Sequence, residues 1–362
     1  MDRWSLHGPA RFLDSVLDAV RSSSNVVIAT SCNAVPDLID TLESRIAEFD
    51  HTRVLDALEW DDPVDEIHAA LDLPYDAVMS RTAASLMKRF ERRRVIFVDV
   101  EGTRPWTAWK AFLGEYESAC RGVLAMERTL FVVRVSGVPK TDLPKRAPAL
   151  EVFSWSGHLS ESDVLSYSLE KLRRHHHRVD RKVKLHARII NKIGAWDLDL
   201  VDHLLARPWD DLFSPSDALA SIAGDGAALP KGIQWEEGGV CELDGEHVRH
   251  ALSLWQRGDP DHELRMRLWA AQASELLPLL EIKRRDLAAR IKRTQKVPPT
   301  ARVFDEVISD IRDVEIGGLL HLSRKFGLPP DILKSAERLR EYRNKLAHLT
   351  PLSADEVLQL LG

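Results

Sequence analysis

Three residues near the end of the chain combine the side chains that can cleave RNA without a metal ion. In the stretch Glu341-Tyr-Arg-Asn-Lys-Leu-Ala-His348, Asn344 and His348 are four residues apart and share one face of a helix, and Arg343 lies beside that face. A histidine, with an ordinary pKa of about 6.5, can take the proton of a ribose 2′-OH or give one to the leaving oxygen. An arginine offers a rigid fork of donors to the negative charge of the transition state. Asn344 could hold the imidazole or the phosphate in place.

A single copy of this helix supplies only one histidine and one arginine, whereas cleavage uses both an acid and a base. Two copies related by a twofold axis would bring two of each to a shared cleft. We therefore expect a homodimer formed through the C-terminal region, with RNA as the substrate. The alternative is that residues 343–348 are only a solvated helix end, because this Arg and His spacing occurs by chance in many helices.

Helices with short connections are expected to position these residues. The apolar positions predict a long helix from His262 to Lys292, in which Pro278 should cause a kink or a break. Further helices are predicted over residues 303–311, 314–326, 331–349 and 354–361, the last one capped by Ser353. Such helices pack as antiparallel neighbours, so residues 261–362 should form an all-α bundle. Trp255 and Trp269 are interpreted as anchors of a core or an interface.

This bundle, with Arg343-Asn344-x-x-x-His348 late in its penultimate helix, resembles a HEPN domain over roughly the last hundred residues. The resemblance implies a bundle of four or five helices, a homodimer and a composite cleft at the dimer interface. Catalytic members are ribonucleases, commonly toxins or antiviral effectors. The family's cleavage residues correspond to Arg343 and His348, and the polar residue after the Arg corresponds to Asn344. Glu315, in an acidic segment that resembles one on the preceding helix, and Tyr342 are supporting candidates.

The first 160 residues alternate between strands and helices. Apolar and β-branched runs predict strands at residues 25–30, 54–55, 94–99, 129–135 and 150–155, and helical spacing predicts helices at 13–20, 38–46, 77–90 and 106–121. Near-continuous apolar strands separated by helices indicate a mostly parallel sheet covered on both faces. The predicted fold class is thus an α/β N-terminal domain followed by an all-α C-terminal bundle.

The order of these elements resembles P-loop ATPases of the AAA and STAND type. In those proteins an acid after an apolar strand positions magnesium and water, and Asp99 and Glu101 occupy that place here, with Arg134 or Ser136 near the end of the next strand. A phosphate loop needs Gly-x4-Gly-Lys-Ser/Thr after the first strand, because backbone amides and a Lys must cradle the phosphates. Residues 26–34 have neither the glycines nor the Lys. We therefore expect a degenerate, P-loop-like domain without a cofactor that is structural or senses a partner, and in which Asp99 caps the next turn.

Two segments separate the predicted domains. Residues 161–213 are expected to form a helical, lid-like segment, and residues 214–260, rich in Gly, Pro and Ser, a connector. The lid-like segment contains a basic stretch that could follow a phosphate backbone, although a solvated helix face is the alternative. Three adjacent histidines, His175 to His177, point in different directions on a helix and make a poor metal site, so no metal is expected. The candidate RNA-binding residues are Arg173, Arg174, Arg178, Arg181, Lys182 and Lys184.

The composition is that of a folded protein without a membrane span. The 362 residues are 44% hydrophobic and 29% charged, with a formal net charge of −6, so any nucleic-acid site must be a local patch. No apolar run of about 18 residues is present, and the N-terminus lacks the pattern of a signal peptide, so a cytoplasmic protein is expected. Cys32, Cys120 and Cys241 lie too far apart in sequence to suggest a zinc site or a disulfide framework.

Together these patterns predict a metal-independent endoribonuclease of the HEPN type with a regulatory or sensing N-terminal domain, in a setting of host defence or of toxin and antitoxin. The second hypothesis is a non-catalytic HEPN module that dimerises and binds a partner in a multi-protein complex, with that partner or trigger at the N-terminal domain. A third, a nucleotide-driven switch, is disfavoured by the missing phosphate loop.

Overall fold

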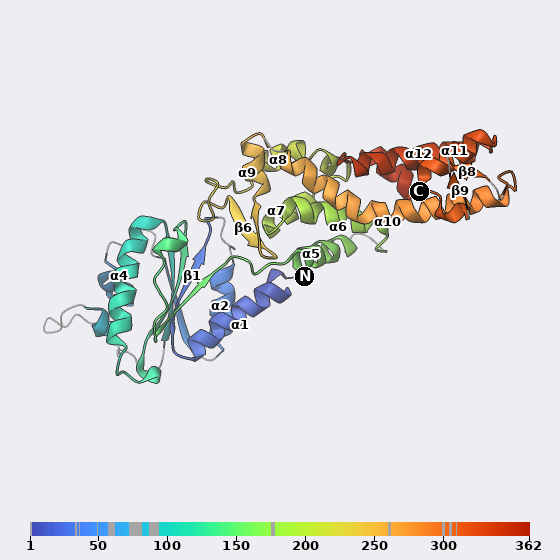
Figure 1. Ribbon diagram of the computed structural model, residues 1–362. Helices are drawn as coiled ribbons and strands as arrows, with labels where there is room; N and C mark the ends of the chain where they lie inside the picture. Colours follow the sequence, from blue (N-terminus) through green and yellow to red (C-terminus); the bar gives the residue numbers. More distant parts are fainter. Residues whose placement is uncertain are drawn as a thin grey trace. The chain divides into compact units, whose positions relative to one another are not determined.

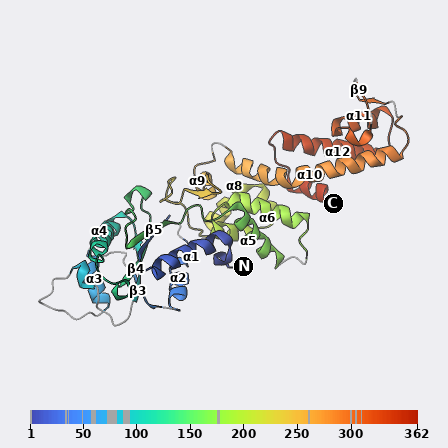
Figure 2. The same ribbon diagram turned by 60° about the horizontal axis from the view of Figure 1, so that its bottom comes forward.

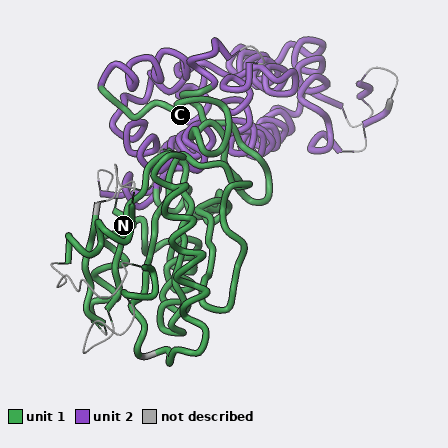
Figure 3. The backbone as a smooth tube through the Cα atoms, turned by 90° about the vertical axis from the view of Figure 1, so that its left-hand side faces the viewer, with its two compact units in different colours: residues 1–167, 226–253 green, residues 168–225, 254–362 purple. Residues whose placement is uncertain are grey.

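The chain forms two compact units, which Figure 3 colours separately. The computed structural model describes residues 2–32, 35, 37–48, 50–56, 62–71, 82–86, 94–174, 178–259, 262–298, 301–303, 306–308 and 310–362. The first unit contains residues 1–167 and 226–253, and the second contains residues 168–225 and 254–362. Each unit therefore takes two separate stretches of the chain.

A five-stranded, all-parallel sheet forms the centre of the first unit. Its strands lie in the order β2-β3-β4-β1-β5. Every residue of β1 is buried, which agrees with its unbroken apolar and β-branched sequence, because a strand covered on both faces presents no side chain to water. The strands are β1 (Asn25–Thr30), β2 (His51–Asp56), β3 (Arg94–Glu101), β4 (Leu130–Ser136) and β5 (Leu150–Ser154).

Helices cover both faces of this sheet (Figures 1 and 2). On one face, α1 (His7–Arg21) and α2 (Leu38–Ile46) enclose a core that includes Ile28, Phe97 and Val132. On the other face, α4 (Thr103–Ala119) places Trp109 and Phe112 edge-on against the ring of Phe131. α3 (Pro63–Ala70) packs beside α4. A parallel sheet between two helical layers confirms the α/β prediction for this part of the chain.

The first unit also takes part of the segment that was expected to be a connector. Residues 240–249 form an antiparallel hairpin of β6 (Val240–Leu243) and β7 (Glu246–Arg249). Its two turn residues, Asp244 and Gly245, both have positive φ, the geometry for which Asp-Gly is well suited. α8 (Pro215–Gly224) and α9 (Ala251–Gln256) flank this hairpin in sequence. The segment 214–260 therefore carries regular structure, and its Gly residues mark turns within it.

The second unit is helical. Its longest element is α10 (Glu263–Arg293), which packs against α6 (Arg181–Gly194) and α12 (Pro330–Ala347) (Figure 1). The remaining helices are α7 (Leu198–Leu205), α8, α11 (Ile316–Lys325) and α13 (Ala354–Leu361), and α5 (Glu161–Arg173) joins the two units in sequence. The predominantly helical character predicted for this region is confirmed, but the region also contains one short pair of strands. Among the described helices, none combines the length and the apolar character that a lipid bilayer requires.

Three helix predictions need correction or qualification. The described residues within 303–311 do not form an α-helix, since β8 (Arg302–Val303) pairs with β9 (Glu306–Val307) and a short 3-10 helix (Ile311–Asp313) follows. α10 runs through Pro278 without a break, and Pro278 lies on its exposed side, where water can serve the carbonyl left without a donor. The helix predicted over 77–90 falls mainly outside the described residues. Within that range the structure describes residues 82–86, and Ala83–Leu86 form a 3-10 helix.

Candidate functional site

The three candidate catalytic residues lie at the C-terminal end of α12. His348 is the residue at which the helix ends, and its backbone N–H donates to the carbonyl of Asn344 at 3.0 Å. The chain then reverses through Leu349, whose φ is +57°. The N–H of Thr350 donates to the carbonyl of Lys345 at 2.9 Å and that of Leu349 to Leu346 at 3.3 Å, which is the pattern of a Schellman motif.

The side chains of this group, which we call the α12 triad (Arg343, Asn344 and His348), face water. Arg343 and His348 are exposed and Asn344 is half-buried. Within the described part of the chain, none of the three side chains takes part in a hydrogen bond or an ion pair. The structure therefore brings the three residues to one helix end, as predicted, and leaves their polar atoms available to a ligand.

The backbone beneath the triad is held by two residues of α10. The Trp269 indole N–H donates to the carbonyl of Leu346 at 2.7 Å. Gln272, which is fully buried, binds both backbone groups of Leu352: its amide donates to the carbonyl at 2.9 Å, and its oxygen accepts from the N–H at 2.6 Å. The first bond adds a second donor to the Leu346 carbonyl, and the other two serve buried backbone groups of Leu352, so together they tie the turn that follows His348 to α10.

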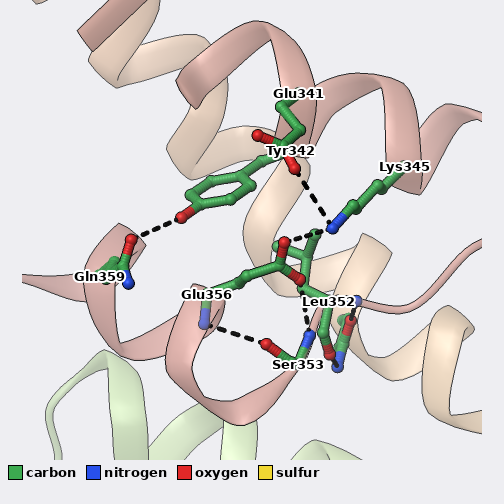
Figure 4. Close-up of polar contacts among 8 residues, drawn as sticks. Glu341, Tyr342, Lys345, Leu352, Ser353, Glu356 and Gln359 are labelled. Atoms are coloured by element: carbon green, nitrogen blue, oxygen red, sulfur yellow. Dashed lines mark hydrogen bonds and ion pairs between the residues drawn. The ribbon is translucent and has the colours of Figure 1, made fainter. Parts of the chain in front are cut away.

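In contrast to Arg343, Lys345 at the same helix end is bound by acidic side chains (Figure 4). Its ammonium group forms ion pairs with Glu356 and, at 3.4 Å, with Glu341. Glu356 and Ser353 also form a capping box at the start of α13, as the position of Ser353 predicted. Burial alone would raise the pKa of Glu356, but Lys345 and Ser353 lower it on balance, and Glu356 in turn raises the pKa of Lys345.

The two supporting candidates lie elsewhere. Tyr342 is buried, its hydroxyl donates to the side-chain oxygen of Gln359 at 2.9 Å, and burial raises its pKa (Figure 4). Glu315 lies just before α11, where its charge adds to the effect of Glu281 in raising the pKa of Arg284. Within the described chain, neither side chain forms a hydrogen bond or an ion pair with the α12 triad, so the structure does not bring them into the site.

The basic residues predicted to contact RNA lie at the end of α5 and the start of α6. All six side chains are exposed. A guanidinium nitrogen of Arg173 lies 3.9 Å from a carboxylate oxygen of Glu170, and the ammonium of Lys182 lies 5.1 Å from the ring centre of Trp209. The other four make no ion pair within the described chain. The run 175–177 lies outside the described residues. The six are Arg173 (beside Glu170), Arg174, Arg178, Arg181, Lys182 (over Trp209) and Lys184.

At the carboxyl edge of the sheet in the first unit, the candidate residues are paired with one another. Asp99 and Arg134 are register partners on β3 and β4, and the guanidinium binds both carboxylate oxygens, one of them at 2.8 Å. A further N–H of Arg134 reaches the carbonyl of Val35 at 3.4 Å. The expectation that Asp99 caps the next turn is therefore wrong: its carboxylate forms a bidentate ion pair with Arg134.

A second set of contacts covers the place where a phosphate loop would lie. Glu101 accepts a hydrogen bond from Lys231 at 3.0 Å, which raises the pKa of the lysine. The backbone N–H of Cys32, just after β1, donates to the carbonyl of Glu236 at 3.0 Å. An N–H that could meet a phosphate is thus already used within the unit. In the described part of the chain, His, Cys, Asp and Glu side chains form no group of three or more that could hold a metal ion.

No protein-family model and no curated protein matches this sequence. Among solved structures, the RuvB Holliday junction branch migration motor of Thermotoga maritima is 10% identical, with a TM-score of 0.31, and the match covers 90% of this chain and 83% of that one. Drosophila ORC bound to DNA is 12% identical, with a TM-score of 0.32, and the match covers 93% of this chain and 88% of that one. Similarity at this level carries no conclusion about function.

Sequence reasoning missed the residues that support the site. Trp269 was interpreted as an anchor of a core or an interface, and its hydrogen bond to the end of α12 was not foreseen. Gln272 was not singled out at all. A polar residue within the apolar stripe of a long helix, one turn from a tryptophan, was the available signal, because a buried amide must find partners.

Proposed function

We propose that this chain is an endoribonuclease of the HEPN type that cleaves RNA without a metal ion and acts as a homodimer. The observation that carries the proposal is the α12 triad: a guanidinium, an amide and an imidazole that have no partner within the described chain, on a helix end fixed from below by Trp269 and Gln272. Side chains on a fixed backbone can keep the geometry that catalysis requires.

The chemistry follows from these groups. The imidazole of His348 in one copy takes the proton of a ribose 2′-OH, and the oxygen attacks the adjacent phosphorus. Arg343 donates hydrogen bonds to the phosphoryl oxygens as their negative charge grows. The bond to the 5′-oxygen breaks, and the second copy of His348 gives that oxygen a proton. The products are a 2′,3′-cyclic phosphate and a 5′-hydroxyl, and no redox partner is needed.

The test is cleavage of a labelled RNA by the purified full-length protein in EDTA. His348→Ala should lower the rate by a factor of about 10²–10⁴, the usual contribution of a positioned acid or base. Arg343→Ala should lower it by about 10²–10³, the usual contribution of one donor to the charge of the transition state. Arg293→Ala is the matched control, since Arg293 is another exposed arginine at a helix end without an ion pair in the described chain. Equal activity in the wild type and both triad variants would remove the assignment.

The biological setting belongs to the same proposal. A ribonuclease that serves in host defence or as a toxin should arrest growth when it is produced in a bacterial host. The His348→Ala variant, made to the same level, should not. Growth arrest by both proteins would separate toxicity from RNA cleavage.

A second candidate function is a non-catalytic module that dimerises and binds a partner. It is favoured by large apolar side chains that stand exposed near the triad in sequence: Leu349 is 48% exposed and Leu358 is 39% exposed. This reading predicts a dimer in sedimentation equilibrium that Leu349→Ser or Leu358→Ser weakens, and no cleavage of RNA by the wild type under any trigger.

A further inference from the structure

A groove with a basic rim lies between α10, α12 and α13. Two matching stripes of residues line it, one on each long helix, and both follow the spacing i, i+3, i+4, i+7, so each stripe is a single helix face. The ends of the stripes meet Gln359 and Leu360 of α13. The stripes are Lys283, Asp286, Leu287 and Arg290 on α10 and Ser335, Arg338, Leu339 and Tyr342 on α12.

The floor of this groove is buried and its rim is positively charged. Leu287, Leu339 and Tyr342 are 2%, 8% and 3% exposed, so they form a closed floor. Three cations and a single acid, Asp286, stand on the lining. Arg290 is paired with Asp331 at 2.5 Å, outside the lining. The rim therefore carries more positive than negative charge even after this pair is counted.

Two of the three cations have no acid of their own. Lys283 is half-buried and Arg338 is exposed, and within the described chain neither side chain forms an ion pair or a hydrogen bond. Arg338 is close enough to Tyr342 to lower the pKa of the phenol slightly against the larger effect of burial. A lysine and an arginine thus line the same groove from facing helices, and neither is bound to an acid within the described chain, so both are available to an anion.

The size of the groove limits what it can hold. Its volume is about 260 Å³. Pockets that enclose a whole small molecule usually measure about 300–1,000 Å³, so this one fits a single group of a longer ligand better than a complete cofactor. A phosphate with part of its ribose is of this size, and its charge complements the rim.

We propose that this groove, with Lys283 and Arg338 as its principal donors, binds a phosphate group of the RNA chain at a position other than the cleaved bond. The identity of the ligand as RNA rests on the proposed function, but the binding of phosphate does not require cleavage. Arg338 would offer two N–H groups to two phosphate oxygens, and Lys283 would add a point charge from the opposite wall. Tyr342 and Leu339 would form the surface on which the sugar rests.

The test is binding of a fluorescent 2′-O-methyl RNA oligonucleotide, which lacks the attacking hydroxyl and cannot be cleaved. The double variant Lys283→Gln/Arg338→Gln should bind about tenfold more weakly, and the slope of its log Kd against log salt concentration should fall by about 0.7–1, the contribution of one phosphate. Gln keeps most of each stem, and both side chains reach the surface, so the fold should persist, as thermal unfolding would verify.

The matched control is Arg265→Gln/Lys292→Gln, which removes the same charge from exposed positions of α10 outside the groove. It should weaken binding less than about threefold, because its charges act only at a distance. An equal loss in both double variants would overturn the proposal, since only net charge would then matter.

Titration with inorganic pyrophosphate distinguishes the source of the phosphate. Pyrophosphate binding that the groove variant loses, with RNA binding unchanged, would keep the phosphate site and assign it to a free ligand. No loss of either probe would overturn it. If Arg343→Ala abolishes cleavage but the groove variant binds RNA normally, the nuclease proposal stands. Only the proposal that the groove binds RNA phosphate is then overturned.

Discussion

The carboxyl edge of the sheet in the first unit and the end of α12 in the second unit both carry the residue types of an active site, yet they use them differently. At the sheet edge, Asp99 binds Arg134 and Glu101 binds Lys231. At the end of α12, Arg343 and His348 have no such partner in the described chain, while the backbone around them is bonded throughout. Both places carry an arginine among other polar side chains, and the difference lies in whether the protein itself uses their polar atoms.

This difference separates structural charges from available ones. A carboxylate and a guanidinium that bind each other in a partly buried place have exchanged water for one another, and a ligand would have to break that pair first. An unpaired cation at the surface keeps its water, which a phosphate can replace. We therefore interpret the sheet edge as a closed structural feature, whereas the end of α12 keeps its polar side chains available, as the proposed nuclease site requires.

The largest expected effect concerns the support beneath the triad. Gln272→Leu would leave the N–H and the carbonyl of Leu352 buried without partners, and each such group costs about 1–3 kcal/mol. The free energy of unfolding of the second unit should fall by about 2–6 kcal/mol, measured by urea unfolding. Cleavage of RNA should fall as well, because the turn after His348 loses its fixed position.

Ser274→Ala is the control for that variant, since Ser274 is exposed and lies on the same helix. It should change stability by less than about 0.5 kcal/mol. If Gln272→Leu unfolds at the same urea concentration as the wild type, the end of α12 is not held in the way described, and the contrast with the sheet edge is lost.

An intermediate effect is expected at the sheet edge. Asp99→Ala would leave the guanidinium of Arg134, 15% exposed, without its carboxylate, and should lower the free energy of unfolding of the first unit by about 1–3 kcal/mol. Glu101→Gln, at an exposed pair, should cost less than about 1 kcal/mol. A double-mutant cycle of Asp99→Ala and Arg134→Met measures the coupling. A coupling energy near zero would mean that the edge is not closed by this pair.

The smallest effect is the pH dependence of the pair between Lys345 and Glu356. The pKa of Glu356 lies below its ordinary value of 4.5 in the folded state, so its contribution to stability is complete above pH 4.5 and is lost as the pH falls through the folded pKa. The pKa of Lys345 is raised above 10.5, so its contribution is lost only as the pH rises past that value. Glu356→Gln should therefore lower stability more at pH 7 than at pH 3.

Urea unfolding at both pH values measures this difference, with Asp355→Asn on the same helix as the control. The difference should stay below about 1 kcal/mol, because both side chains are partly exposed. The free energies of unfolding of the wild type and of Glu356→Gln could instead differ by the same amount at pH 3 and pH 7. That result would mean that Glu356 does not pair with Lys345, and the distinction between paired and available charges at this helix end would be wrong.

Much of the α/β unit could be predicted from local sequence. β1, β3 and β4 are apolar runs because both of their faces are covered, and the amphipathic spacing of α1 reflects its single buried face. The order β2-β3-β4-β1-β5 could not be read in the same way, since it depends on which distant strands pair. The closing of the sheet edge by Lys231 and Glu236 is likewise a contact between segments far apart in sequence.

The errors in the helical unit have local causes. Val303, Val307 and Ile311 are spaced four apart, which imitates a helix, although Arg302 and Val303 pair as a strand with Glu306 and Val307. Pro278 was expected to kink or break α10, and the helix is not broken there, because a helix tolerates a proline on its exposed side. The α12 triad was found because its motif is contiguous. The basic groove was missed because its two stripes, each regular in itself, are about fifty residues apart in sequence.

One helix connects the support of the triad with the groove. Gln272 and Lys283 are eleven residues apart on α10, which is close to three whole turns, so they face nearly the same side of the helix about 16 Å apart along its axis. A single residue inserted between them would rotate one of them by about 100° away from its neighbours. The number of residues in this stretch of α10 is therefore constrained more strictly than their identity. The stretch sets the distance and the rotation about the helix axis between the support of the triad and the groove, the two places where the protein would bind one RNA strand.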